Sequence, residues 1–186
     1  MMIRVLVVLS LMTVFGCTSI QTNSDINPKT DFSLLKTYGW LNEIDQLSDD
    51  IRVNNKLTRE TVRTAIEESL QAKGFIKADR DQADFLIAWF GAIEKKIRTE
   101  NIEHFYAPYG YGTLYRDPNW NPELNQKPVA EYEEGSLIID FLDPDKHGLI
   151  WRGTGTGKIV EEQTQERAQK NLSQAVHKIL EGFPPR

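Results

Sequence analysis

The order of hydrophobic patterns along this chain predicts an α+β fold, a mostly antiparallel sheet with two helices packed on one face. Two segments, 54–73 and 164–181, carry apolar residues at helical spacing. Other segments alternate apolar and polar residues or are apolar throughout, as strands are. The resulting order of strand, helix, strands, hairpin and helix describes an α+β domain, and helices on one face of the sheet are its simplest packing.

The first sixteen residues, 1–16, predict a signal peptide. Arg4 precedes an eleven-residue, largely apolar run over 5–15, well short of the roughly 20 residues that a membrane-spanning helix needs. The run ends in the letters VFGC, which resemble the lipobox of bacterial lipoproteins. This resemblance implies cleavage before Cys17, the single cysteine of the chain, and covalent lipid on that residue. Thr18 after it implies sorting to the outer membrane.

The polar segment that follows shows no apolar periodicity. We expect 17–30 to form a lipidated tether, of which about thirteen extended residues could span on the order of 40 Å. The folded domain is then expected over 31–186, on the periplasmic side of the outer membrane. Its membrane contact would be made through the lipid anchor.

The charge of the chain is acidic. It holds 22 Lys and Arg against 27 Asp and Glu, a net charge of −5, which becomes −6 once Arg4 is removed with the signal. Such a chain is repelled by nucleic acid, so no nucleic-acid partner is expected.

The domain begins with a predicted strand over 32–41, which is β-prone and aromatic. The helix over 54–73 carries charged residues on the face opposite its apolar stripe, and Gly74 is suited to end it. The segment 83–93 is apolar on both alternating faces, which indicates a central strand covered on both sides.

A hairpin is predicted after a long loop. Residues 135–143 alternate apolar and polar residues, and a further strand begins near Leu149. The letters DPDKHG between them have the composition of a turn. The last helix, 164–181, is followed by Gly182 and two prolines, which terminate it.

The second hairpin strand contains WRGTGTGK, residues 151–158, which raises the question of a phosphate-binding loop. The required glycine, lysine and hydroxyl spacing is absent, and no helix start follows. Alternation instead predicts a strand on which small residues form a groove where a helix packs close to bare backbone. No nucleotide is expected, and the groove residues are Trp151, Gly153, Gly155 and Gly157.

Three separated segments resemble one known family. They are DFSLLKTYGW (31–40), GSLIIDFLDPDKHGLIWRGTGTG (135–157) and LEGFPP (180–185). Together they are similar to a bacterial envelope lipoprotein family described as domain of unknown function 4136. The resemblance implies a compact α+β periplasmic domain behind a lipid anchor. It implies no catalytic residue.

The loop 102–125 is unusually rich in aromatic residues interleaved with Gly, Pro and Asn. Such composition is typical of surfaces that stack on sugars or peptides. The alternative is that the loop folds back over the sheet and buries its rings. The residues proposed to contact a partner are Tyr106, Tyr109, Tyr111, Tyr115 and Trp120.

A cluster of acidic residues and a histidine surrounds the predicted turn: Asp140, Asp143, Asp145 and His147. The spacing of a calcium-binding loop is absent, so we interpret the segment as a turn and expect no metal. No recognisable pairing of a nucleophile with a base occurs. The chain is therefore expected not to be an enzyme, and to carry no cofactor besides the lipid on Cys17.

The leading functional hypothesis is a non-catalytic lipoprotein that binds an envelope protein or peptidoglycan in the periplasm. An alternative is a small-ligand or transport accessory protein that uses the groove beside 151–158. An enzyme is the third option.

Overall fold

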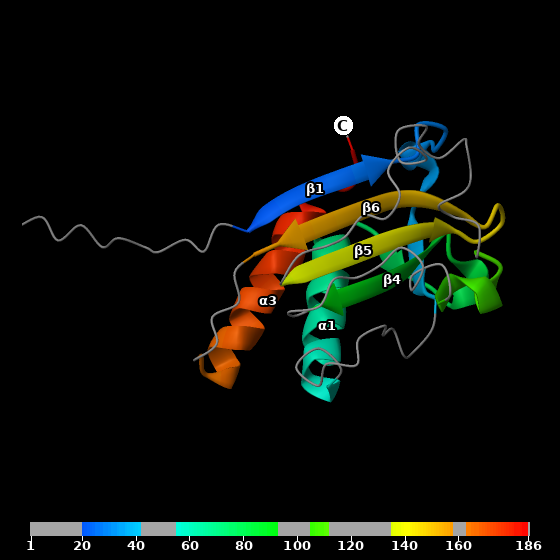
Figure 1. Ribbon diagram of the computed structural model, residues 1–186. Coiled ribbons are helices and arrows are strands. Elements are labelled where there is room, and N and C mark those ends of the chain that lie inside the picture. The colour runs from blue at the N-terminus through cyan, green and yellow to red at the C-terminus, as the bar shows by residue number, and fades with distance from the viewer. Residues whose placement is uncertain (1–19, 42–54, 93–104, 112–134, 158–162, 186) are drawn as a thin grey trace, which may run out of the picture.

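The computed structural model describes residues 20–41, 55–92, 105–111, 135–157 and 163–185. Within these ranges the chain forms a mixed six-stranded sheet, with strand order β1-β6-β5-β4-β2-β3, and two helices packed together (Figure 1). The strands are β1 (Gln21–Ile26), β2 (Thr37–Trp40), β3 (Ile76–Lys77), β4 (Phe85–Ala92), β5 (Ser136–Asp143) and β6 (Gly148–Thr156). The helices are α1 (Lys56–Ala72) and α3 (Gln165–Leu180). This confirms the predicted α+β class.

Four neighbouring strands, β1, β6, β5 and β4, pair antiparallel. Strand β2 runs parallel to β4 on one side and to the short β3 on the other, so the sheet is mixed at this edge. The hairpin of β5 and β6 lies between β1 and β4 and matches the predicted hairpin closely. Its turn lies at one end of the sheet, and the start of β1 lies at the other (Figure 1).

Both helices begin at a side-chain cap and end where the sequence predicts. The Asn55 side chain accepts a hydrogen bond from the backbone N–H of Thr58 at 2.8 Å, which satisfies a donor that the first turn of α1 would leave unpaired. Gly74 follows α1 with a φ of 89°, a left-handed conformation that glycine adopts without strain. At the start of α3, the Thr164 hydroxyl accepts the N–H of Arg167 at 3.3 Å.

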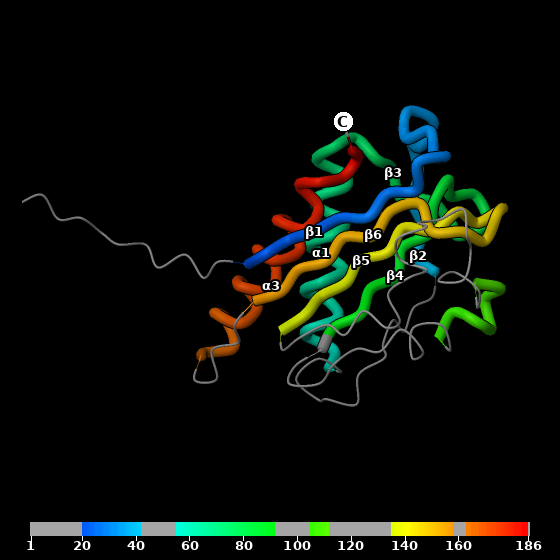
Figure 2. The backbone as a smooth tube through the Cα atoms, turned by 45° about the horizontal axis from the view of Figure 1, so that its top comes forward, coloured from blue at the N-terminus to red at the C-terminus, as the bar shows by residue number. Residues whose placement is uncertain are grey.

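The sheet carries a hydrophobic core on each face. The helices cover one face, where aliphatic side chains of α1 and α3 pack against aromatic rings from the strands. Figure 2 shows α1 and α3 together behind the sheet. The buried residues of this helix-side core include Tyr38, Ile66, Leu70, Phe85, Trp89, Phe141, Trp151 and Ile179. The opposite face carries a second core that includes Leu86, Phe90, Tyr106, Tyr111, Ile138 and Leu149.

The tether expected over 17–30 is wrong from Gln21 onward. Residues Gln21–Ile26 form an edge strand whose six residues pair with β6, from Gln21 opposite Thr156 to Ile26 opposite Trp151. The segment is polar because an edge strand with exposed side chains has no buried face to impose an apolar alternation. Its backbone is nevertheless part of the sheet.

The strand expected over 32–41 is only partly correct. A 3-10 turn, η1 (Phe32–Leu34), comes first, and the strand begins at Thr37. The Asp31 carboxylate accepts the N–H of Ser33 and fixes this turn. Asp84 then accepts the backbone N–H groups of Lys36 and Thr37, both at 2.8 Å, and holds the start of β2 beside the start of β4.

The predicted signal peptide 1–16 and Cys17 lie outside the described residues. Among the residues that are described, neither helix has both the length and the apolar content to cross a membrane.

Candidate binding cleft at the turn end of the sheet

The glycine-bearing strand receives a helix at very close range. A Cβ atom added at Gly153 would overlap Cγ2 of Ile179 and the ring of Trp151, which leans over this position. One added at Gly155 would lie 2.7 Å from Cδ1 of the same Ile179 side chain. Such contacts leave no room even for a methyl group. The alternative of a ligand groove beside 151–158 is therefore wrong, because Ile179 and Trp151 fill the space.

The opposite face of the sheet is covered in part by the described portion of the aromatic loop, 105–111. Tyr106 is fully buried there, and its ring packs edge-on against Phe90 with centroids 5.5 Å apart. Tyr111 is 2% exposed. This supports the alternative in which the loop folds over the sheet. The prediction that Tyr106 and Tyr111 contact a partner directly is wrong, because their rings are packed in the second core.

A buried polar group lies under this loop. Asp140 of β5 and Arg152 of β6 face each other across the hairpin, and Nε and Nη2 of Arg152 each donate to a separate carboxylate oxygen at 2.5 Å. The Tyr106 hydroxyl donates to the same carboxylate at 2.7 Å. Asp140 and Arg152 are 0% and 2% exposed. The group fastens the loop to the sheet.

Burial acts on both charges of this pair. Burial raises the pKa of the Asp140 carboxyl, whereas the hydrogen bond from Tyr106 lowers it. Burial also lowers the pKa of Arg152 to about 10, so the guanidinium stays charged at neutral pH. All three donors around Asp140 require an acceptor, and only the ionised carboxylate accepts from all of them. We conclude that the pair is an ion pair.

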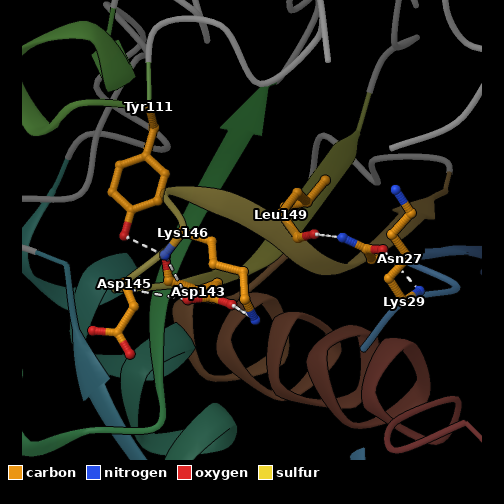
Figure 3. A network of polar contacts seen from close by, with 7 residues as sticks. All are labelled: Asn27, Lys29, Tyr111, Asp143, Asp145, Lys146 and Leu149. Carbon is orange, nitrogen blue, oxygen red and sulfur yellow. Dashed lines mark hydrogen bonds and ion pairs between the residues drawn. The ribbon is translucent and has the colours of Figure 1, made fainter. Parts of the chain in front are cut away.

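Tyr111 connects the loop to the turn between β5 and β6. Its hydroxyl donates to the backbone oxygen of Asp143 at 3.1 Å, as Figure 3 shows. The Asp143 carboxylate in turn accepts the backbone N–H groups of Asp145 and Lys146 at 3.0 and 2.9 Å, and the Lys146 ammonium at 3.1 Å. His147 completes the turn with a φ of 50° and packs on the Tyr111 ring, with centroids 5.0 Å apart.

Burial raises the pKa of Tyr111 to about 12. A neutral phenol that donates to a backbone carbonyl is therefore the stable form well beyond neutral pH.

On the other side of the hairpin, the Asn27 side chain donates to the backbone oxygen of Leu149 at 3.1 Å (Figure 3). The turn is held from both sides.

A cleft of about 590 Å³ opens at this end of the sheet. Four stretches of chain meet there: η1, the 3-10 turn η2 (Arg80–Gln82), the segment that contains η3 (Ala107–Tyr109), and the β5–β6 turn. Its lining is Leu34 and Leu35, residues 80–84, Leu86, Tyr109, Tyr111 and residues 143–147.

Charged and aromatic side chains dominate the wall of the cleft. The Arg80 guanidinium lies over the Tyr109 ring, 5.5 Å from its centroid, and this cation–π contact stabilises the positions of both side chains. Partial burial by itself would raise the pKa of Asp84, but the N–H groups of Lys36 and Thr37 outweigh that effect and lower it. Asp81 and Asp145 are exposed at the rim. The cleft therefore presents both cationic hydrogen-bond donors and anionic hydrogen-bond acceptors beside an aromatic ring.

The structure separates the remaining predicted residues. Of the proposed partner-binding set, only Tyr109 lines the cleft with part of its ring exposed, while Tyr115 and Trp120 lie outside the described residues. Of the acidic turn cluster, Asp143, Asp145 and His147 line the cleft, and Asp140 lies buried beneath the loop. No group of three potential metal ligands gathers in the described part of the chain.

Arg80 and Asp84 are cleft residues that the sequence does not single out. They lie in a short charged segment with no periodicity, at the start of the strand predicted over 83–93. The sequence contains only part of the information needed to place these two residues in a cleft. The letters ADRDQAD, 78–84, mark a polar break before an apolar strand, which predicts a surface turn but not its neighbours.

Comparison with known proteins identifies the family and the fold. A family model for a domain of unknown function, DUF4136, matches residues 22–185. The fold is similar to that of a DUF4136 family protein from Bacteroides thetaiotaomicron, with TM-score 0.53 and 17% identity over 88% of this chain and 94% of that one. It is also similar to PelC from Paraburkholderia phytofirmans, solved as a dodecamer, with TM-score 0.50 and 9% identity over 90% of this chain and 99% of that one.

At these identities the two structures show a shared fold alone. Comparison with curated proteins gives no match. The family match begins at residue 22, inside β1, in agreement with the assignment of this strand to the domain. Because the match extends over most of its length, the chain belongs to the DUF4136 family.

Proposed function

We propose that this protein is a non-catalytic, lipid-anchored protein of the periplasmic side of the outer membrane, and that it binds peptidoglycan in the cleft at the turn end of the sheet. The observation that carries the proposal is the cleft itself. Its volume of about 590 Å³ lies within the range of roughly 300–1,000 Å³ that is usual for pockets that bind small ligands. The lipid on Cys17 is supported by the sequence pattern around it.

The chemistry of the wall favours a saccharide with attached peptide. Such a polymer presents hydroxyl, amide, carboxylate and amine groups, for which Arg80, Asp81 and Asp145 offer complementary partners. The flat ring of Tyr109 can stack on a sugar face at low entropic cost.

A protein partner is less well supported by the described surface. Stable protein interfaces bury about 800 Å² on each partner, with aromatic or apolar anchors near the centre. Within the described residues, the exposed large apolar side chains are Ile26, Leu34 and Ile76. Of these, only Leu34 lines the cleft. They do not form the anchor cluster that such an interface needs.

A non-catalytic role is supported by a serine–histidine contact within the described residues that resembles a catalytic pair. Ser69 Oγ lies 2.7 Å from Nδ1 of His177, where α1 packs on α3. The Ser69 hydroxyl, however, donates its proton to the backbone oxygen of Ala65 at 2.7 Å, so the imidazole is not placed to remove it. The contact joins two helices and lies outside the cleft lining.

The proposal is tested by co-sedimentation of the full chain with purified peptidoglycan sacculi. We expect Arg80→Ala to weaken retention roughly tenfold, since loss of a charged hydrogen-bond donor costs about 1.5–3 kcal/mol. Arg167→Ala is the matched control, because Arg167 is an exposed arginine on α3 that does not line the cleft. Equal retention of the two variants and the unchanged chain would refute the cleft as the binding site.

A further inference from the structure

We propose that the end of the sheet at which β1 starts lies against the lipid surface, and that the cleft is thereby held at the far end, pointing into the periplasm. This inference rests on the proposed function, because it requires lipid on Cys17. It replaces the long tether of the sequence prediction with a short and orienting connection.

The short length of chain between Cys17 and β1 limits how far the lipid can lie from the sheet. Gln21 is already paired with Thr156 of β6, and the backbone oxygen of Ile20 accepts the Lys178 ammonium at 2.5 Å. Only Thr18 and Ser19 lie between Cys17 and Ile20, and the three residue-to-residue steps from Cys17 to Ile20 can span no more than about 11 Å. The lipidated residue therefore cannot lie further than this from the start of the sheet.

Three strand ends surround the point where the anchoring segment joins the sheet. The start of β1, the end of β6 and the start of β5 meet there, with Ser136 and Gln21 both opposite Thr156 on its two sides. The backbone N–H of Gly157 also donates to the oxygen of Gly135 at 3.2 Å, which ties the strand ends together. In both Figure 1 and Figure 2, the first turns of α3 lie at this same end of the molecule.

The charge of α3 suits an anionic lipid surface. Although the whole chain has a net charge of −5, this helix carries three cations and a single acidic residue, Glu166. A basic residue near an anionic bilayer contributes about 1 kcal/mol of attraction, so the helix favours the same orientation that the short connection imposes. The cations are Arg167, Lys170 and Lys178, all of them exposed.

The cleft lies at the other end of the same strands. Strand β5 leaves the anchored end at Ser136 and reaches the cleft at Asp143, and β6 returns from Gly148 to Thr156. Eight residues of extended strand cover roughly 25 Å at about 3.3 Å each. A ligand in the cleft is therefore bound about that far beyond the membrane-facing end, where a cell-wall polymer is accessible and a lipid headgroup is not.

Energy transfer between single labels and labelled lipid tests this orientation. Cys17 is the single native cysteine, so a new cysteine gives a unique site when Cys17 carries lipid. Full-length lipidated Gln21→Cys and Asp145→Cys proteins, both altered at exposed positions, are reconstituted into vesicles of phosphatidylethanolamine and phosphatidylglycerol that contain a headgroup acceptor dye. We expect transfer at least roughly twofold higher from position 21 than from position 145, because the two ends lie roughly 25 Å apart.

A spacer variant provides the control. Insertion of twelve Gly and Ser residues after Thr18 should bring the two transfer efficiencies close together, because a flexible chain of that length no longer fixes the orientation. Equal transfer from both sites without the spacer would overturn the inference while leaving lipidation intact. A chain whose Cys17 reacts with the dye and fails to bind vesicles would instead refute the proposed anchor, and the inference with it.

Discussion

Asp140 and Arg152 lie opposite each other on β5 and β6, joined by two hydrogen bonds of 2.5 Å and closed off from water by Tyr106. This buried pair is the polar centre of the face that the aromatic segment covers. It links the loop, the hairpin and, through the hairpin turn, the wall of the cleft. Removal of one partner leaves the other charge buried without compensation, which is the costly case for such pairs.

We predict that Asp140→Ala lowers the free energy of unfolding by about 3–5 kcal/mol. Tyr106→Phe should cost about 1 kcal/mol, because it removes one hydroxyl donor and leaves the ion pair. Urea unfolding followed by circular dichroism measures both. Joint replacement, Asp140→Leu with Arg152→Met, should recover most of the loss. A cost below about 1 kcal/mol for Asp140→Ala would contradict the assignment of a buried ion pair.

We predict that Gly153→Ala lowers the free energy of unfolding by about 1–3 kcal/mol, because the new methyl group collides with Ile179 and Trp151. Gly157→Ala is the matched control, since its Cβ would meet nothing closer than 3.6 Å. That substitution should be neutral or slightly stabilising. Thermal unfolding distinguishes the two, at roughly 2–4 °C per kcal/mol for a chain of this size. Equal midpoints would argue against close packing of α3 on β6.

The edge strand β1 gives a third prediction. A chain that begins at Asn27 should be less stable than one that begins at Gln21 by at least about 2 kcal/mol, because several ladder hydrogen bonds of about 0.5–1.5 kcal/mol each are lost. The exposed edge of β6 should also promote aggregation. Size-exclusion chromatography and thermal unfolding of the two chains measure this. If 21–26 were a tether, the two chains would behave alike.

The raised pKa of Tyr111 predicts a pH dependence at the alkaline end. The folded state holds the Tyr111 proton up to about pH 12, whereas the unfolded chain releases it near pH 10. The unfolded state therefore binds fewer protons in this window, and Tyr111 makes the free energy of unfolding fall as pH rises from about 10 to about 12. Tyr111→Phe should flatten this part of the profile. Ultraviolet absorbance titration of tyrosinate should lose one phenol that ionises near pH 12 in the same variant.

The elements with a clear period were predictable from the sequence, and those without one were not. The helices near 56–72 and 165–180 have an apolar stripe and end at glycine or a cap, so local signals suffice. Strand β4 is apolar on both faces because it has a core on each side. Strand β1 gives no such signal, because its side chains are exposed and its partner strand β6 lies far along the chain.

The cleft was predictable only in fragments. Composition indicates a turn at 143–148 and an aromatic loop at 102–125, but it cannot indicate that Arg80 lies over Tyr109. That contact depends on how separate loops converge at one end of the sheet. The sequence alone likewise could not decide whether Tyr106 and Tyr111 are buried, because aromatic residues in a polar loop suit both a binding surface and a small secondary core. For Tyr106, the hydrogen bond to the buried Asp140–Arg152 pair holds the ring inside the second core.

Tyr109 has the most direct role among the proposed contact residues. We predict that Tyr109→Ala weakens retention on sacculi roughly fivefold or more, since loss of a stacking ring costs about 1–2 kcal/mol. Its partly exposed ring packs only at the edge of the second core, whereas Tyr111 is buried within it, so the unfolding midpoint should change by less than that of Tyr111→Ala. The two midpoints and the two retention curves together separate a binding role from a packing role. A Tyr109→Ala chain that binds as well as the unchanged one would remove this ring from the site.

Site-specific photo-crosslinking in intact cells tests peptidoglycan binding in the cleft most directly, with the reactive probe at Asp145 in the cleft and a control probe at Glu166 on α3. We predict muropeptide adducts, detected by mass spectrometry after digestion of the wall, from the probe at position 145 and not from position 166. A discrete protein adduct at position 145 without muropeptide, or equal muropeptide labelling from both positions, would contradict the proposal.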